Sequence, residues 1–220
     1  MTKENAVRQL PYWDKLTETE KSFIEKNTTV RTYEKGTILH GCSEACLGMI
    51  QVMSGAVRVL MLSEEGREIT LFRLEPGDSC ILSASCVLSQ ITFETQMIAS
   101  EKTEIAVVNA GAFLALMENN LNVKCFAYEL ATERFSTVVW VMQQIIFARF
   151  DQRLAGFLLK YYERTGQMEL RMTQEAIAQE VNTAREVVAR MLKQFSSDGL
   201  IEVDRGTITI KSITGLKSLL

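Results

Sequence analysis

The chain has 220 residues, of which 47% are apolar, 23% are charged and 2 are proline, a composition that excludes disordered, collagen-like and low-complexity proteins. This length allows one large domain or two small ones. The net charge of −3 neither indicates nor excludes a nucleic-acid partner; residues 150–220, with 10 basic against 9 acidic residues, are less acidic than residues 1–149, with 14 against 18. Because no apolar run of about 18 residues and no apolar leader occur, we expect a cytoplasmic protein with no membrane partner.

The first predicted element is a short helix over residues 17–26. Thr17 and, three residues later, Glu20 form a capping box, in which each side chain accepts a hydrogen bond from the other residue's backbone N–H. We expect Phe23 and Ile24 to face the core. After this helix the pattern changes from helical spacing to that of strands.

Residues 30–108 contain short runs rich in β-branched residues, separated by turn pairs such as Ser54-Gly55 and Pro76-Gly77. Several short strands at near-regular spacing predict a sandwich or barrel with a jelly-roll path. The predicted fold class is therefore α+β, beginning with an N-terminal β-barrel or jelly roll. The clearest strands are residues 47–53, 56–62, 68–74, 92–99 and 104–108.

Neither glycine nor proline occurs between Gly111 and Gly156, which predicts an unusually long helix. Apolar residues there alternate in steps of three and four, the pattern of a coiled-coil seam, with Lys124 as one polar break. The seam consists of Leu121, Tyr128, Ala131, Phe135, Val138, Met142 and Ile145. A second apolar stripe on another face consists of Phe126, Leu130 and Val141.

One apolar face of this helix can pack on the β-domain, and the other requires a partner helix. We therefore expect a parallel homodimer; the alternative is a helix wholly buried within one chain. The predicted domains are an effector-sensing β-domain over residues 1–118, a dimerisation helix over 119–147 and a third domain over 148–220. The predicted dimer-interface residues are Tyr128, Phe135, Val138, Met142 and Ile145.

The third domain contains a helix-turn-helix pattern. Thr173 is a good cap for a short helix over residues 174–180, and Asn182 suits a turn residue of left-handed conformation. Thr183 can cap a second helix, over residues 184–196. The residues spaced to meet between the two helices are Ile177, Val181, Val188 and Met191.

Further elements flank the helix-turn-helix on both sides. A break near residues 147–151 starts a helix that ends at Thr165-Gly166, where glycine is a natural stop. After the helix-turn-helix, residues 200–203 and 207–210 predict a β-hairpin across Asp204-Arg205-Gly206. The C-terminal domain is therefore predicted to be a winged helix-turn-helix.

The exposed face of the second helix has the chemistry of base recognition. Arginine can donate two hydrogen bonds to guanine, and glutamate can accept one from the cytosine N4 amine. Arg185, Glu186 and Arg190 occupy the first two turns, and an acidic residue beside two arginines would weaken plain phosphate binding. We therefore predict contacts with double-stranded DNA; the alternative is a solvated helix with an intrahelical Glu186–Arg190 pair.

With these elements in this order, the chain resembles the CRP/FNR superfamily of bacterial transcription regulators over nearly its full length, most specifically in the segment Arg185–Arg190. The resemblance implies a cyclic-nucleotide-binding-like β-domain and base contacts by Arg185, Glu186 and Arg190. It also implies a phosphate contact by Thr173, to which we add Thr183 as a further DNA-binding residue. A homodimer on a palindrome of TGTGA-like half-sites, with RNA polymerase as another partner, is the functional expectation.

The predicted effector region departs from the cAMP-binding pattern of that family. No lysine or arginine occurs from Leu74 to Glu101, and burial of a phosphate without a cation is costly. We therefore expect a signal other than cAMP, either an unidentified small molecule or a redox change. Cys80 and Cys86 lie in this stretch, so the alternative is a thiol- or metal-responsive regulator of the same fold that uses them.

The residues give no positive indication of a cofactor, a metal or catalysis. An iron–sulfur cluster needs four thiolates, and the FNR branch of the family places its cysteines ahead of the β-domain, where this chain has none. His40 is the only histidine, which excludes a two-histidine metal site. We expect no cofactor and no enzymatic activity; the remote alternative is a β-barrel enzyme, for which no catalytic motif occurs.

Overall fold

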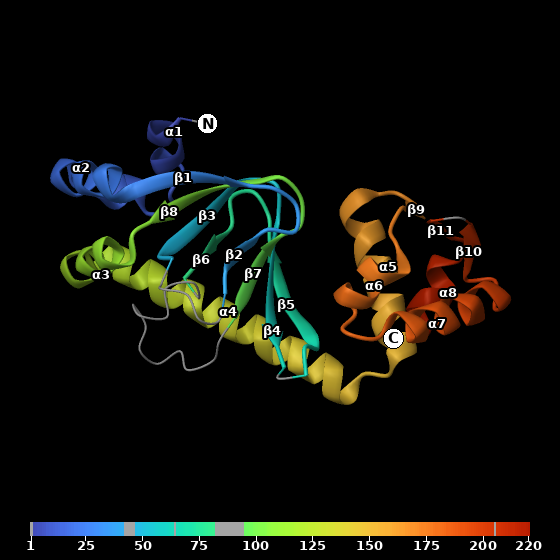
Figure 1. Ribbon diagram of the computed structural model, residues 1–220. Coiled ribbons are helices and arrows are strands. Elements are labelled where there is room, and N and C mark those ends of the chain that lie inside the picture. The colour runs from blue at the N-terminus through green and yellow to red at the C-terminus, as the bar shows by residue number, and fades with distance from the viewer. Residues whose placement is uncertain (1, 42–46, 64, 82–94, 205) are drawn as a thin grey trace. The chain divides into compact units, whose positions relative to one another are not determined.

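The computed structural model describes residues 2–41, 47–63, 65–81, 95–204 and 206–220. The chain divides into two compact units, Met1–Val139 and Trp140–Leu220 (Figure 1). The first unit holds two β-sheets and a group of helices, and the second holds mainly helices with one small sheet. None of the described helices is long and apolar enough to cross a membrane.

Two antiparallel sheets of four strands each form the β-sandwich of the first unit. Their strand orders are β1-β8-β3-β6 and β2-β7-β4-β5, so neighbours in space are mostly distant in sequence, as in a jelly roll. This confirms the predicted fold class, and the described strands form two separate sheets rather than one closed barrel. The strands are β1 (Thr28–Tyr33), β2 (Ile38–His40), β3 (Met49–Ser54), β4 (Val57–Leu62), β5 (Glu68–Leu74), β6 (Ser79–Cys80), β7 (Gln96–Ala99) and β8 (Thr103–Val108).

The predicted strands agree with the observed ones to within a few residues. β5 has the predicted bounds, and β4 and β8 each differ by one residue at one end. Residues 92–94 of the predicted strand 92–99 lie outside the described residues, and β7 begins at Gln96. β1, β2 and β6 were not among the predicted strands. The runs of three and two residues in β2 and β6 are too short to show an alternating pattern.

The pairing of β3 with β8 illustrates how the register places apolar side chains between the sheets. Ile50 lies opposite Val107, and both are buried in the core of the sandwich. β3 begins at Met49, two residues after the predicted start. The preceding Gly48 has a φ of 111°, and a Cβ there would overlap the carbonyl oxygen of Val108, so only glycine fits this approach between chain segments.

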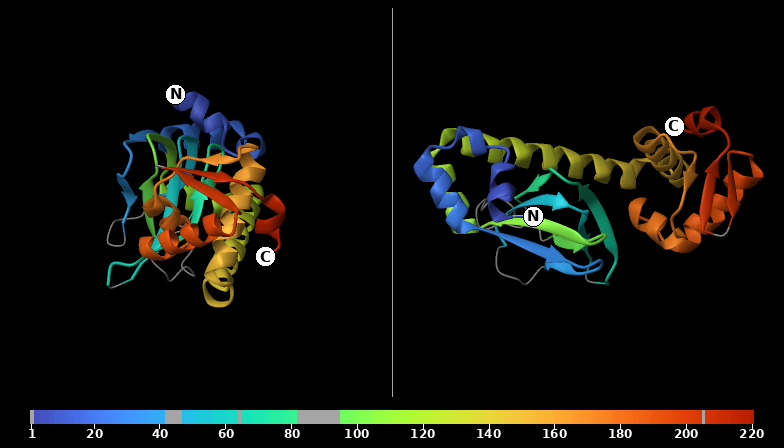
Figure 2. Two further views of the ribbon diagram at one scale, coloured as in Figure 1. Left: turned by 90° about the vertical axis from the view of Figure 1, so that its right-hand side faces the viewer. Right: turned by 90° about the horizontal axis from the view of Figure 1, so that it is seen from above.

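Helices cover one face of the sheet β1-β8-β3-β6, and Figure 2 shows the N-terminal helices at the same end of the sheets as α3 and the start of α4. Their shared core centres on Tyr12, whose ring lies 6.0 Å from that of Phe113 and 5.3 Å from that of Phe126. These helices are α1 (Lys3–Arg8), the 3-10 turn η1 (Trp13–Lys15), α2 (Glu18–Asn27), α3 (Ala110–Asn119) and α4 (Leu121–Phe147).

The capping box at the start of α2 is confirmed. The Glu20 N–H donates to Thr17 Oγ1 at 3.4 Å, and the Thr17 N–H donates to Glu20 Oε2 at 2.7 Å, a hydrogen bond that lowers the pKa of the Glu20 carboxyl. Ile24 is fully buried, as expected. The expectation that Phe23 also faces the core is wrong: its side chain is 40% exposed, because one helical step turns it about 100° away from Ile24.

The predicted 44-residue segment without glycine or proline is divided at two points. Asn120 separates α3 from α4, and its Oδ1 accepts hydrogen bonds from the N–H groups of Asn122 and Val123 at 3.0 and 3.4 Å. This break was not predicted from the sequence. The second break, at residues 148–149, lies within the predicted interval and precedes α5 (Phe150–Thr165).

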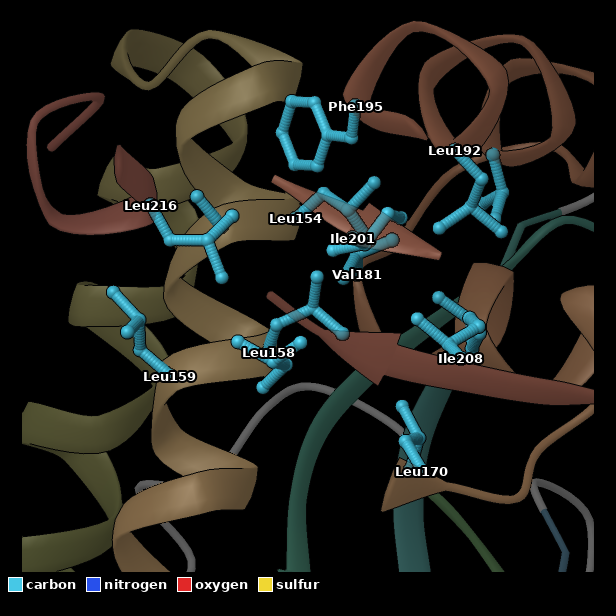
Figure 3. Close-up of a cluster of buried hydrophobic side chains, with 14 of the residues drawn as sticks. Leu154, Leu158, Leu159, Leu170, Val181, Leu192, Phe195, Ile201, Ile208 and Leu216 are labelled. Atoms are coloured by element: carbon cyan, nitrogen blue, oxygen red, sulfur yellow. The ribbon is translucent and has the colours of Figure 1, made fainter. Parts of the chain in front are cut away.

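The second unit has the predicted winged helix-turn-helix fold, in which a three-stranded antiparallel sheet packs with four helices. Leu154 and Leu158 of α5 gather with Leu170, Ile201 and Ile208 of the sheet in one apolar core (Figure 3). Besides α5, the elements are β9 (Glu169–Leu170), α6 (Gln174–Glu180), α7 (Arg185–Ser197), β10 (Ile201–Asp204), β11 (Thr207–Ile210) and α8 (Ile213–Lys217).

The turn between α6 and α7 gives a first testable prediction. Asn182 has a φ of 51°, where a Cβ is unfavourable and asparagine is tolerated better than most residues. We expect Asn182→Ala to lower the free energy of unfolding by about 1–2 kcal/mol. Asn182→Gly is the matched control, because it removes the same amide group but readily adopts a positive φ. It should lower the free energy of unfolding by clearly less than Asn182→Ala does. Urea unfolding followed by circular dichroism measures both; equal losses in the two variants would contradict the backbone explanation.

Candidate DNA-binding and effector sites

A cap, a turn and a shared core hold the helix-turn-helix of the second unit. Thr173 Oγ1 accepts a hydrogen bond from the Ala176 N–H at 3.1 Å, which confirms the predicted cap of α6. Asn182 adopts the left-handed conformation expected of it. Met191 is partly buried against the core of this unit. The other three residues predicted to meet between the helices are fully part of that core: Ile177, Val181 and Val188.

The predicted cap of α7 by Thr183 is wrong. α7 begins at Arg185, and its N-cap residue is Ala184, whose side chain has no acceptor. Thr183 instead donates its backbone N–H to the Ala178 carbonyl oxygen at 3.0 Å, so it belongs to the turn. This hydrogen bond closes the turn onto α6. α7 therefore starts at Arg185, one residue after the start that the predicted Thr183 cap implied.

Arg185, Glu186 and Arg190 lie on the exposed face of α7. Their side chains make no hydrogen bond or ion pair within the part of the chain that the structure describes, so the alternative of an intrahelical Glu186–Arg190 pair is not found. The rotation of the helix is set by its other face, where the buried residues are Val188, Leu192 and Phe195. These three exposed side chains, called the α7 triad below, are thus available to a partner molecule.

The wing next to α7 is a short β-hairpin with a paired lysine at its base. β10 and β11 pair from Ile201 opposite Ile210 to Asp204 opposite Thr207. Lys211 Nζ donates to Glu202 Oε2 at 2.5 Å, and this hydrogen bond raises the pKa of the lysine. The Lys211 charge is therefore already compensated within the domain, in contrast to the charges of the α7 triad.

The predicted dimer seam on α4 is divided between the chain's own core and its surface. Tyr128, Phe135 and Met142 are 51%, 67% and 53% exposed, so the helix is not wholly buried within one chain. Val138 is half-buried and packs against the core between the sheets, and Ile145 is half-buried. Leu121, Tyr128, Phe135 and Met142 follow one another at intervals of seven residues. They therefore form one narrow exposed stripe along the helix.

The inward face of α4 carries a charged residue that the sequence analysis missed. Arg134 continues the buried stripe of Val123, Ala127 and Leu130, and only 9% of its side chain is exposed. Its Nη2 donates to the Ser79 carbonyl oxygen of β6 at 3.2 Å. Arg134 lies outside residues 74–101, the stretch that contains no lysine or arginine, and an arginine on an otherwise apolar helical stripe was its signal in the sequence.

The predicted cysteines of the effector region are only partly described. Cys80 is fully buried among apolar side chains between the two sheets, and Cys86 lies outside the described residues. Cys125 is an exposed residue of α4. Among the residues that the structure describes, no group of three or more His, Cys, Asp or Glu side chains is arranged to hold a metal ion.

Comparison with known proteins places both units in one family. A Crp-like helix-turn-helix domain model matches residues 152–219, and a cyclic nucleotide-binding domain model matches residues 30–120. A crystal structure from Eubacterium rectale, described as a transcriptional regulator of the CRP/FNR family, is 38% identical, covers 96% of this chain and 98% of its own, and superimposes with a TM-score of 0.89.

Two curated relatives agree with this. The cAMP-activated global transcriptional regulator CRP of Pasteurella multocida is 24% identical over 183 residues, or 80% of this chain and 86% of that protein. The anaerobic regulatory protein of Haemophilus influenzae is 26% identical over 198 residues, or 84% and 74%. A double-sheet β-domain followed by a long helix and a winged helix-turn-helix defines a transcription regulator with a DNA-binding domain. The chain belongs to the CRP/FNR superfamily.

The corrected cap of α7 gives a second prediction. We expect Ala184→Ser to raise the free energy of unfolding by about 0.5–2 kcal/mol, because a serine hydroxyl at the N-cap can accept a hydrogen bond from the first turn. Thr183→Ala, which removes no cap, should change it by less than about 0.5 kcal/mol. Urea unfolding of the two variants is the measurement. A larger loss in Thr183→Ala than gain in Ala184→Ser would restore the original assignment.

Proposed function

We propose that the protein is a sequence-specific DNA-binding regulator that acts as a homodimer on a palindromic site with TGTGA-like half-sites, under the control of a signal at its β-domain. The observation that carries this proposal is the α7 triad, which is exposed and unpaired within the described part of the chain. The Pasteurella multocida relative, which matches 80% of this chain, is named as a transcriptional regulator, which supports the same role here.

The chemistry of the triad favours base edges over the DNA backbone. Arg185 and Arg190 can each donate two hydrogen bonds to guanine, and a good bidentate pair contributes about 1–3 kcal/mol of discrimination. Glu186 can only accept, so it is repelled by phosphate and suits the cytosine amine. Thr173, exposed at the first turn of α6, supports the proposed phosphate contact, and Thr183 in the adjoining turn is proposed as a further contact.

A dimer through α4 follows from its exposed apolar stripe. Leu121, Tyr128, Phe135 and Met142 are spaced by seven residues, the repeat at which two parallel helices bury each other's side chains. Such a dimer has two-fold symmetry, so its two α7 helices would contact half-sites one turn, about 34 Å, apart. RNA polymerase is proposed as the partner through which DNA binding affects transcription.

The proposed signal is a molecule other than cAMP that binds where α4 meets the β-sandwich. Although the Pasteurella multocida relative is named as cAMP-activated, residues 74–101 of this chain contain no cation. No observation on the described residues favours the thiol- or metal-responsive alternative, since Cys80 is fully buried in the core between the sheets. Neither does any favour the β-barrel enzyme.

The base-contact proposal predicts a change of specificity in Arg190→Ala. We expect weaker binding of a TGTGA palindrome by about 1–3 kcal/mol and a relaxed preference at one guanine. Fluorescence anisotropy at fixed salt, with the palindrome and its single-base variants, measures both. The matched control is Lys193→Ala on the exposed side of the same helix, which should weaken all sequences alike. Uniform weakening in Arg190→Ala would instead identify Arg190 as a phosphate contact.

The dimer proposal predicts that Phe135→Ser weakens self-association. Loss of a buried phenyl ring from each protomer removes about 1.5–3 kcal/mol of apolar burial per ring, so the dimer dissociation constant should rise at least tenfold. Analytical ultracentrifugation of the full chain measures it, with Glu129→Ser at an exposed polar position of α4 as the control. If the wild-type protein is a monomer, or if Phe135→Ser leaves the dissociation constant unchanged, the proposed dimer interface through α4 is contradicted.

A further inference from the structure

α4 places a positive charge in the interior of the β-domain. The Arg134 guanidinium carbon lies 4.9 Å from the centre of the Phe72 ring of β5, and Nη2 reaches the Ser79 carbonyl oxygen of β6 at 3.2 Å. Phe72 belongs to the apolar core between the sheets, and Val138, one turn along α4 from Arg134, packs against the same core. A cationic group and two apolar side chains therefore share this location.

The hydrogen bonding of this guanidinium is incomplete. Nε of Arg134 is buried and has no hydrogen-bond partner among the described residues, although an arginine side chain carries five N–H donors. Within the described part of the chain, its ion pair is with Glu133, the preceding residue of the helix, at 3.7 Å from Nη1, and that carboxylate is mostly exposed to solvent. A buried charge is costly unless it is paired and fully hydrogen-bonded. The folded chain thus leaves part of this cost uncompensated.

Arg58 of β4 shows how the same β-domain satisfies a buried arginine. Its side chain is as buried as that of Arg134, but its Nη2 donates to Glu68 Oε2 at 2.6 Å and its Nη1 to Thr70 Oγ1 at 3.3 Å. A carboxylate and a hydroxyl from the neighbouring strand β5 thereby bind two of its nitrogens. Among the described residues, the ion pair of Arg134 is with the mostly exposed carboxylate of Glu133, and no buried carboxylate completes its hydrogen bonding as Glu68 does for Arg58.

We propose that Arg134 binds the carboxylate of a small organic acid whose apolar body lies against Phe72 and Val138, and that this acid is the signal of the β-domain. A flat carboxylate matches the guanidinium fork and can accept from Nε, the donor that has no partner among the described residues. The apolar neighbours favour an aromatic or aliphatic body over a sugar or a nucleobase. This inference rests on the proposed function only in naming the acid as the signal.

The first experiment measures binding without DNA, so its failure is distinct from failure of the proposed DNA site. Sodium benzoate is titrated into the full chain by calorimetry, with benzamide as the neutral analogue and inorganic phosphate and cAMP as competing anions. We expect benzoate to bind and benzamide not to bind. Arg134→Met should weaken benzoate binding at least about tenfold, the loss expected for a charge-assisted hydrogen bond.

The control variant is Arg67→Met, which removes the same charge from an exposed position. It should leave benzoate binding unchanged. Equal affinity for benzoate and benzamide, equal losses in Arg134→Met and Arg67→Met, binding of phosphate or cAMP but not benzoate, or no binding of benzoate would each overturn the proposal.

A second measurement needs no ligand. If the buried Arg134 guanidinium is kept only partly compensated for an anion, Arg134→Met should raise the thermal unfolding midpoint of the free protein by about 2 °C or more, because it removes a buried charge whose hydrogen bonding is incomplete. Arg58→Met, which breaks a complete ion pair, should lower the midpoint. A fall of similar size in both variants would make Arg134 a structural residue and contradict the proposal.

Discussion

The first unit and the proposed assembly both depend on the two faces of α4. One stripe of this helix, Val123, Ala127 and Leu130, must be buried to complete the core of the first unit. One residue further along, about 100° around the helix, lies the stripe of Tyr128, Phe135 and Met142, which that core leaves exposed. Because the inward stripe fixes the rotation of the helix, it also determines which side chains remain for a second copy and which point toward the sheets.

The parts of the fold that were predicted correctly are those whose signal is local. The Thr17–Glu20 capping box, the Thr173 cap and the left-handed Asn182 each depend on residues within four positions of one another. The exposed α7 triad follows from the same helical spacing that buries Val188. Strand spacing was enough to predict a jelly roll, but the strand orders of the two sheets depend on pairing between distant segments, which spacing does not encode.

Some of the errors concern positions decided by contacts between distant segments, and others concern competing local contacts. Asn120 interrupts a segment of strong helix formers, since its side chain both caps α4 and donates to the Lys15 carbonyl oxygen, more than one hundred residues away. The start of α7 shifted because Thr183 closes the turn onto α6. The sequence shows Arg134 only as one charged residue on an apolar stripe. Its contacts with β5 and β6 could not be predicted without knowing that α4 lies against these strands.

In the proposed dimer, the stripe on α4 would also make the stability of the protein depend on its concentration. A protomer that exposes several large apolar side chains on one helix gains stability whenever a second copy covers them, so folding and association become linked equilibria. In the proposed dimer, the midpoint of thermal denaturation would then rise with protein concentration. In a growing cell, dilution of the protein would then lower the concentration of folded dimers more steeply than the total protein concentration. The rate of synthesis would thereby influence how much of the DNA site is bound.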